Sequence, residues 1–223
     1  MTIKSINSTV DYVVGFTAVP DELYGSGQDG VVTIATNTTL SRDMYYDTLT
    51  IAEGVHVNTN GFRVFVRNSL NLSPNLATQS TTSIGLKNGS SVVGTLAGGS
   101  TTSATNSLGG NSASYSVTGP TPTNYFNLPR NAVVGYTLHA SQTTPLPLKG
   151  GAGDGTNPGG GVVVVCARKT YGYGTIYATG YYNGSTYTTG GGVIIWASQV
   201  ATGTNVTFST TGYASGTTKT FTI

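Results

Sequence analysis

Apolar and polar residues alternate in short runs through the first third of the chain, and turn-forming residues interrupt the pattern between runs. A period of two predicts β-strands with one buried face, and no stretch shows the 3.6-residue period of an amphipathic helix. The runs are VVTIA at 31–35, DTLTIA at 47–52, GVHVNTNG at 54–61 and FRVFVRNSLNL at 62–72. This part of the chain is therefore predicted to form a series of short strands.

The run FRVFV shows how the two faces of one strand are expected to differ. Side chains alternate between the faces of a strand, so Phe62, Val64 and Val66 share one face. Arg63, Phe65 and Arg67 share the other. The first face is predicted to be core, and the second is predicted to carry charge.

The last third of the chain contains a repeat. GGGVVVVCA at 159–167 returns as GGGVIIWAS at 190–198, 31 residues later. Each copy is expected to continue through a loop into a second strand, GTIYATG at 174–180 and GTNVTFSTTG at 203–212. GVHVNTNG resembles these second strands and represents a degraded third copy. A fixed period of this kind predicts stacked coils of similar length.

Glycine and valine have separate roles in this prediction. The glycines are expected at sharp corners, where a residue that accepts positive φ is needed. The valine run suits a strand buried on both faces, because such a strand need not alternate. Cys166 lies in this run and is predicted to be a small core residue.

The fold class predicted from these patterns is all-β, a parallel β-helix-like stack of short coils with glycine-rich turns. An antiparallel β-sandwich or jelly roll is the alternative, and it explains the offset between the two glycine-valine runs less well. Four parts are expected along the chain: an N-terminal docking arm (1–23), a β module (24–77), a low-complexity and proline-rich β/loop insertion (78–149) and a glycine-rich β-coil region (150–223).

Charge is sparse, since only 8% of the residues are charged and the formal net charge is +2. The ten basic residues are scattered, so nucleic acid is not an expected partner. No apolar run approaches the roughly 18 residues of a membrane span, and the first residues lack the apolar core of a signal peptide. The chain is expected to be made in a cytoplasm and to bind no membrane.

The distribution of carboxylates argues against an enzyme. Seven of the eight lie at or before position 53, and only Asp154 follows them. Glycoside cleavage generally needs two opposed carboxylates, and Asp43 and Asp47 are expected to lie on a surface loop instead. His56 and His139 have no second ligand at metal-binding spacing. No catalytic residue, metal or cofactor is predicted.

Tyrosine provides the only candidate binding residues. Six tyrosines lie between positions 171 and 187, in a segment otherwise rich in glycine, asparagine, serine and threonine. This composition is typical of recognition loops, because the ring offers contact area and the hydroxyl offers hydrogen bonds. The alternative is that they are strand-forming residues on a half-buried sheet or at a subunit interface. The candidates are Tyr171, Tyr173, Tyr177, Tyr181, Tyr182 and Tyr187.

Residues 24–72 resemble a module that recurs in glycine-rich virion proteins of tailed bacteriophages. The resemblance rests on the glycine-aspartate turn GSGQDG, on LSRDMYYDTLTI and on NTNGFRVFV. GGGVVVVCAR followed by GTIYATG resembles the partner half of the same architecture. The resemblance implies a structural protein on the virion surface, a homotrimer built of stacked β-coils, and it brings no catalytic residues.

Two functions follow from these expectations. The first is a capsid decoration or cement protein, whose arm contacts the major capsid protein of the virion. The second is a tail-fibre or spike-tip adhesin, whose tyrosines bind a host surface polysaccharide. A depolymerase is disfavoured by the distribution of carboxylates.

Overall fold

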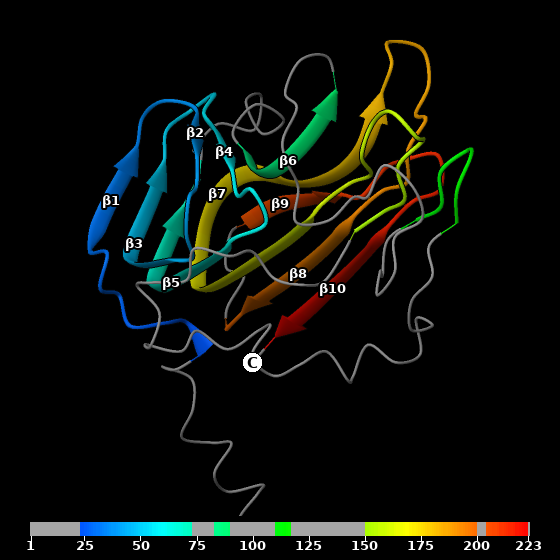
Figure 1. The fold of residues 1–223 in the computed structure, drawn as a ribbon. Helices are drawn as coiled ribbons and strands as arrows, with labels where there is room; N and C mark the ends of the chain where they lie inside the picture. The colour runs from blue at the N-terminus through cyan, green and yellow to red at the C-terminus, as the bar shows by residue number, and fades with distance from the viewer. Residues whose placement is uncertain (1–22, 73–82, 90–109, 117–149, 200–203, 223) are drawn as a thin grey trace, which may run out of the picture.

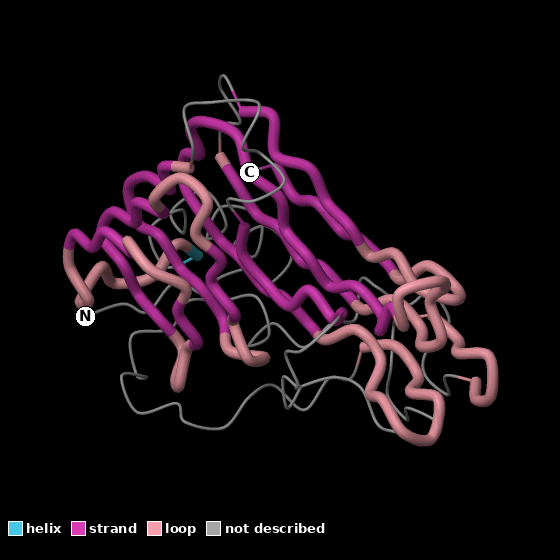
Figure 2. Tube along the Cα trace, turned by 90° about the horizontal axis from the view of Figure 1, so that it is seen from above, coloured by secondary structure: helices cyan, strands magenta, loops and turns pink. Residues whose placement is uncertain are grey.

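The computed structural model describes residues 23–72, 83–89, 110–116, 150–199 and 204–222, which form parallel strands and loops with essentially no helix (Figures 1 and 2). The predicted all-β class is confirmed. Residues 1–22 of the predicted arm lie outside the described residues, as do 90–109 and 117–149 of the predicted insertion. The strands are β1 (Val31–Ile34), β2 (Thr38–Thr39), β3 (Met44–Ile51), β4 (His56–Asn58), β5 (Arg63–Asn71), β6 (Ser83–Gly89), β7 (Val162–Tyr182), β8 (Val193–Ser198), β9 (Thr204–Ser209) and β10 (Thr217–Thr222).

The strands form two hydrogen-bonded ladders, and each ladder follows the order of the chain. The first ladder is β1-β3-β5-β7-β8-β10 and the second is β2-β4-β6-β7-β9. Every strand pair in the described residues is parallel. The antiparallel alternative is therefore wrong for this part of the chain. Successive strands alternate between the ladders, and β7 belongs to both.

β7 corrects one expectation about the repeat. A loop was expected between GGGVVVVCA and GTIYATG, but β7 runs without interruption for 21 residues (Figure 1). Its first part pairs with β5 as far as Tyr171, and its second part pairs with β9 from Gly172 onward. Gly172 has a φ of 83°, so glycine allows the strand to change direction where it passes between ladders.

The repeat itself is confirmed by the register of the strands. Val162 pairs with Val193 in the first ladder, so the first valine of one glycine-valine run lies beside the first valine of the other. Gly174 pairs with Val206 in the second ladder, which brings the two second strands side by side as well. The degraded copy GVHVNTNG supplies β4, which lies in the same ladder as β7 and β9.

The main core lies between the ladders. Apolar side chains from both ladders pack into one buried cluster, which we call the inner cluster. It includes Val64 and Val163 of the first ladder and Val57, Ile84 and Ile176 of the second. Alternating residues of the strands thus meet across the interior, as burial of one face of each ladder requires.

The opposite face of the first ladder is also buried. Here Tyr45, Phe65, Val164 and Ile195 form an outer cluster with Tyr24. The rings of Tyr45 and Phe65 are stacked, with centroids 5.1 Å apart. Both faces of the ladder therefore exclude water at this place.

The valine run and Cys166 lie as predicted. Val163 and Val165 belong to the inner cluster, and Val162 and Val164 belong to the outer cluster. Cys166 is buried in the outer cluster, and burial raises the pKa of its thiol to about 12. The double burial explains why this segment does not alternate.

The charged face predicted for FRVFV is wrong at two of its three positions. Phe62, Val64 and Val66 are in the inner cluster, as expected. On the other face Phe65 is buried, and so is Arg63, which binds Asp43. Only Arg67 has an exposed side chain.

Asp43 was expected on a surface loop and is buried instead. Its Oδ1 accepts the backbone N–H of Arg63 at 2.8 Å, and its Oδ2 accepts Nε of Arg63 at 2.7 Å. The guanidinium also lies 5.4 Å from the ring centroid of Phe65. A buried charge pair needs this number of hydrogen bonds to compensate for lost hydration.

No helix in the described residues is long and apolar enough to span a membrane.

Candidate functional site

One end of the molecule is built almost entirely from glycine-rich loops. Figure 1 places these loops at the right, beyond the start of β7, β8 and β10, and places β1 at the left, and Figure 2 shows loops gathered at the right as well. We call their shared base the glycine bundle. It consists of residues 110–113, 150–152, 159–161, 178–181, 188–193 and 210–217, which are joined by backbone hydrogen bonds.

Residues 188–193 lie at the centre of the bundle. The carbonyl groups of Thr188 and Gly191 accept hydrogen bonds from one segment, 110–113. The carbonyl groups of Thr189 and Gly192, one residue further on, accept from another segment, 213–217. Along 188–193, every third carbonyl group therefore faces the same neighbouring segment. A repeat of three residues is that of an extended polyproline II-type backbone, whereas a β-strand repeats every two residues.

The N–H groups of this central segment point to further neighbours. Gly190 donates to Ala152 O at 2.9 Å, Gly191 to Ala214 O at 2.9 Å and Gly192 to Ala178 O at 2.6 Å. Three successive residues thus bind three different segments. In the bundle, each central main-chain segment is therefore hydrogen-bonded to neighbours on several sides.

The close approach of main chains is the reason for the glycines, and this corrects the prediction of positive φ. None of the glycines in 159–161 or 190–192 has a positive φ, and neither Gly180 nor Gly212 does. A Cβ on Gly191 would instead lie 2.6 Å from Gly216 N and would overlap Thr210 O. Positive φ does occur in GVHVNTNG, where Gly61 has a φ of 79°.

We call the four loops at this end the tip loops, and part of their main chain belongs to the bundle. They are residues 110–116, 150–158, 182–188 and 210–216. Direct hydrogen bonds connect the first loop to the other three: Ala152 N donates to Gly110 O, Ala113 N to Thr188 O and Ala214 N to Asn111 O. The main chains of the four tip loops are therefore directly joined to one another.

Three of the tip loops each expose a tyrosine. The exposed fractions are 39% for Tyr115, 39% for Tyr182 and 60% for Tyr213. In the described residues, the other large apolar side chains with comparable exposure are Tyr171 and Val31. Tyr115 and Tyr213 were not among the predicted residues, although each lies in a short run of glycine, serine and alanine that could have indicated a loop.

The six predicted tyrosines do not form one site. Tyr171 and Tyr173 lie where β7 bends, and at 3.3 Å per residue Tyr173 is about 30 Å along the strand from Tyr182. Tyr182 and Tyr187 come together, with ring centroids 5.1 Å apart. Tyr181 lies beside them, and its carbonyl accepts the N–H of Thr188.

Tyr177, which lies earlier in β7, is close enough to Tyr187 to affect its pKa. Burial raises the pKa of Tyr187, and the neighbouring Tyr182 and Tyr177 raise it further. Tyr187 is thus half-buried against the ring of Tyr182 and lies near Tyr177. The structure brings the rings of Tyr182 and Tyr187 together, with Tyr177 near Tyr187 and Tyr181 next to Tyr182 along the chain, and leaves the other two elsewhere.

A tight hairpin holds Tyr182 and Tyr187 opposite each other. Asn183 N donates to Thr186 O at 3.1 Å, and the side-chain oxygen of Asn183 accepts N–H groups from Ser185 and Thr186, each at 2.9 Å. Gly184 has a φ of 97°, which the turn requires. An antiparallel bridge links Tyr182 and Tyr187 and fixes the two rings on one side.

Asp154 is the carboxylate of the tip loops, and its oxygens are occupied. Oδ1 accepts N–H groups from Thr156 at 2.9 Å and from Asn157 at 2.7 Å. Oδ2 accepts the hydroxyl of Thr188 and the amide of Asn157. Burial alone would raise the pKa, but these hydrogen bonds lower it to about 2. A carboxylate held ionised in this way is a poor general acid.

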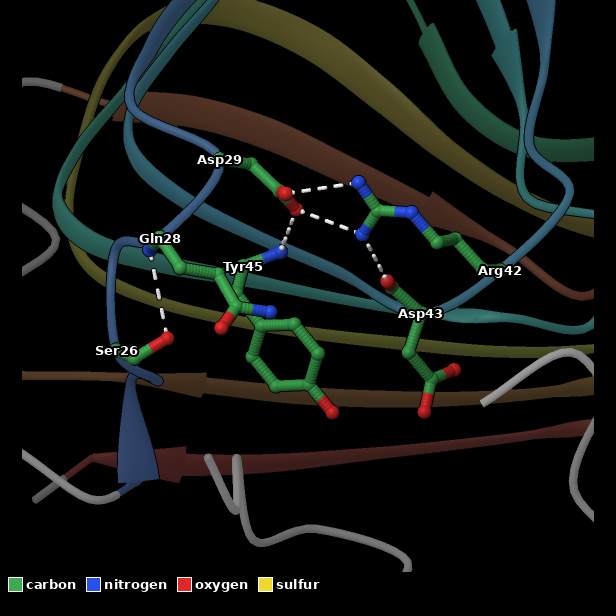
Figure 3. A network of polar contacts seen from close by, with 6 residues as sticks. All are labelled: Ser26, Gln28, Asp29, Arg42, Asp43 and Tyr45. Atoms are coloured by element: carbon green, nitrogen blue, oxygen red, sulfur yellow. Dashed lines mark hydrogen bonds and ion pairs between the residues drawn. The ribbon is translucent and has the colours of Figure 1, made fainter. Parts of the chain in front are cut away.

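The carboxylates near β1 are also engaged, as Figure 3 shows for Asp29. Its oxygens accept both terminal nitrogens of Arg42, at 2.8 and 3.0 Å, and Oδ2 also accepts Tyr45 N at 2.7 Å. Burial opposes ionisation of Asp29, but the bonds from Arg42 and Tyr45 N outweigh it and lower the pKa. This network ties the GSGQDG turn to β3. Asp47, which was expected on a surface loop with Asp43, is on β3 and contacts Arg67 and Asn68.

Within the described part of the chain, no three His, Cys, Asp or Glu side chains gather into a group that could hold a metal ion. His139 lies outside the described residues.

No family model matches the chain, and neither do any of the curated proteins or solved structures with which it was compared.

Proposed function

We propose that this chain is a non-enzymatic structural protein of a tailed-phage virion and that it acts as a fibre or spike-tip adhesin for a host surface polysaccharide. The observation that carries the proposal is the tip, where three exposed tyrosines project from hydrogen-bonded loops. Aromatic rings presented by rigid loops are well suited to binding, because little conformational entropy is lost on contact.

We further propose that the fold is a parallel β-helix-like stack of short coils. The chain order of both ladders supports this, since each pass of the chain adds one strand to each ladder. A stack of this kind presents few unpaired strand edges, which suits a particle exposed to proteases and dilution.

The two ends of the stack suit different tasks. β1 and the tip lie at opposite ends of the molecule (Figure 1). Val31 on the edge strand β1 is 75% exposed, which favours attachment to another protein at that end. The same observation supports the second candidate, a decoration protein bound to the major capsid protein on the outside of the shell.

In either position we propose a homotrimer, as the resemblance to phage virion proteins implies. Light scattering on the purified chain should then give three times the chain mass of 22.8 kDa.

Adsorption of phage to host cells tests the adhesin. Replacing both Tyr182 and Tyr213 by Ala should lower the adsorption rate by about tenfold or more, as truncation of aromatic anchors generally does. Tyr171→Ala is the matched control, because Tyr171 is 43% exposed but lies away from the tip. Normal adsorption of the double variant would refute the adhesin.

Copy number per virion separates the two positions. Quantitative mass spectrometry against the major capsid protein should find few copies of an adhesin. A number comparable to that of the capsid protein would move the chain to the shell and favour decoration.

A further inference from the structure

We propose that the tip binds uncharged saccharides, with a sugar ring stacked on Tyr182 and sugar hydroxyls bound by the polar groups of the surrounding loops. This inference rests on the proposed adhesin function and adds the chemical class of the ligand.

The stacking platform is held in place before any ligand binds. Tyr182 lies in the hairpin closed by Asn183, and the ring of Tyr187 packs against it at an interplanar angle of 55°. Tyr187 is the more buried of the two, so it supports the ring of Tyr182, which is 39% exposed. A supported aromatic ring can accept the apolar face of a sugar without reorganisation.

The surroundings of this ring are rich in neutral hydrogen-bonding groups. The hairpin has the sequence YNGSTYT, and the neighbouring loops have GNSASYS at 110–116 and TTGYASG at 210–216. Asn183, Ser185 and Thr186 are exposed next to Tyr182. Hydroxyl and amide groups both donate and accept, so they match the hydroxyls of a sugar.

The charge of the tip selects against acidic ligands. In the four tip loops, the single formal charge belongs to Asp154, and four hydrogen bonds keep its carboxylate ionised. The carboxylate is fully occupied, so it serves the loops and is not available to a ligand. Its negative charge disfavours sialic acid, uronic acids and phosphate by like-charge repulsion.

Binding of defined oligosaccharides to the purified full chain tests the inference. The probes are neutral oligosaccharides of glucose, galactose and N-acetylglucosamine, each with an acidic counterpart carrying sialic acid, uronic acid or phosphate on the same core. We expect binding to at least one neutral probe, weaker binding to its acidic counterpart and little change between low and high salt, because no ion pair is involved.

Three variants locate the site. Tyr182→Ala should lower the affinity for the neutral probe by about tenfold or more, whereas Tyr182→Phe should retain most of this affinity because the ring remains. Tyr171→Ala is the control and should bind as the unaltered chain does. Circular dichroism and melting curves establish that each variant is folded. Equal binding by Tyr182→Ala and Tyr171→Ala would overturn the stacking site.

The remaining outcomes distinguish this inference from the function on which it rests. Binding to acidic probes alone would overturn the uncharged class and leave the adhesin intact. If no saccharide binds but the tip variants fail to adsorb, the receptor is of another class: this inference and the polysaccharide ligand of the proposed function both fail, and the adhesin role alone stands. If no saccharide binds and the tip variants adsorb normally, the proposed function fails as well.

Discussion

Replacing Gly191 by Ala should destabilise the protein strongly, although the change adds only one methyl group. Gly191 is central to the glycine bundle: its N–H donates to Ala214 O, and its carbonyl accepts from Gly110 N. A Cβ at this position would lie 2.6 Å from Gly216 N and would overlap Thr210 O. All of these neighbours are main-chain atoms, so none can move aside by a change of rotamer.

The size of the effect follows from what would have to move. Relief of the overlap requires a shift of roughly 1 Å in residues 210–216, and inserting extra volume into a packed region typically costs about 1–3 kcal/mol. The shift also strains the bonds that join this segment to the centre of the bundle, from Gly191 N to Ala214 O and from Tyr213 N to Thr189 O. Each such bond is worth about 0.5–1.5 kcal/mol. We therefore expect a loss of about 3 kcal/mol, which for a chain of this length corresponds to a fall of about 6–12 °C in melting temperature.

Gly161→Ala is the matched control, because it adds the same methyl group in the same bundle. No atom lies within 4 Å of a Cβ built on Gly161, and its φ is not positive. A Gly→Ala change at such a place usually stabilises a protein by about 0.4–1 kcal/mol, through the unfolded chain. Calorimetry and urea unfolding of both variants decide the matter. If Gly191→Ala melts no lower than Gly161→Ala, the reasoning from close main-chain approach is wrong.

Two further predictions concern charged groups. Asp43→Asn should lower the free energy of unfolding, measured in urea, by about 3–5 kcal/mol, because it leaves the Arg63 guanidinium buried without its partner charge. A free energy of unfolding within about 0.5 kcal/mol of the unaltered chain would contradict this, since that is the ordinary range for a surface change. The pKa of Asp154 is lowered to about 2 in the folded state, so its contribution to stability is complete above the unfolded value of 3.8 and is lost as the pH falls through about 2. The difference in melting temperature between the unaltered chain and Asp154→Asn should therefore shrink between pH 5 and pH 2, and a constant difference would refute the assignment.

The parts of the fold that the sequence predicted well are those in which paired strands are separated by segments of similar length. β7 and β8 carry no insertion between corresponding residues, so Val162 and Val193 are recognisable as a repeat. Elsewhere the spacing of paired strands differs: Val31 pairs with the nearby Thr48, whereas Arg63 pairs with Val164, which lies beyond the whole central part of the chain. A search for a fixed period cannot find paired strands whose spacing changes by this much.

The valine run predicted burial on both faces for the first part of β7, but burial of the outer face could not be predicted from the alternating pattern of β5. Arg63 and Asp43 are charged, and charged residues are exposed by default unless they find a partner. The partner is 20 residues away in the sequence, and nothing local indicates the contact. Both faces of the first ladder are buried at this place. Alternate residues of a strand there point into the inner cluster and the outer cluster, and neither set points into solvent.

The candidate site was predicted in part, because composition indicates the residue type but not its place. The tyrosines near 171–187 are strand residues at one end of the segment and tip residues at the other, although the local composition is similar throughout. Tyr115 and Tyr213 join the tip through main-chain hydrogen bonds between loops that are far apart in the sequence. Such contacts depend on the bundle and leave no signal in the residues themselves.

Glycine has two physical roles in this chain, and their separation explains how the tip can serve recognition. Near β1, Gly25, Gly27 and Gly30 have positive φ and shape turns. In the bundle, glycine admits close main-chain contact, and the segments of the base are held together chiefly by hydrogen bonds between main-chain atoms. The exposed side chains of the tip, such as Tyr182 and Tyr213, therefore make little contribution to the base beneath them. A base held by main-chain bonds allows the projecting residues to change with the ligand while the scaffold stays the same.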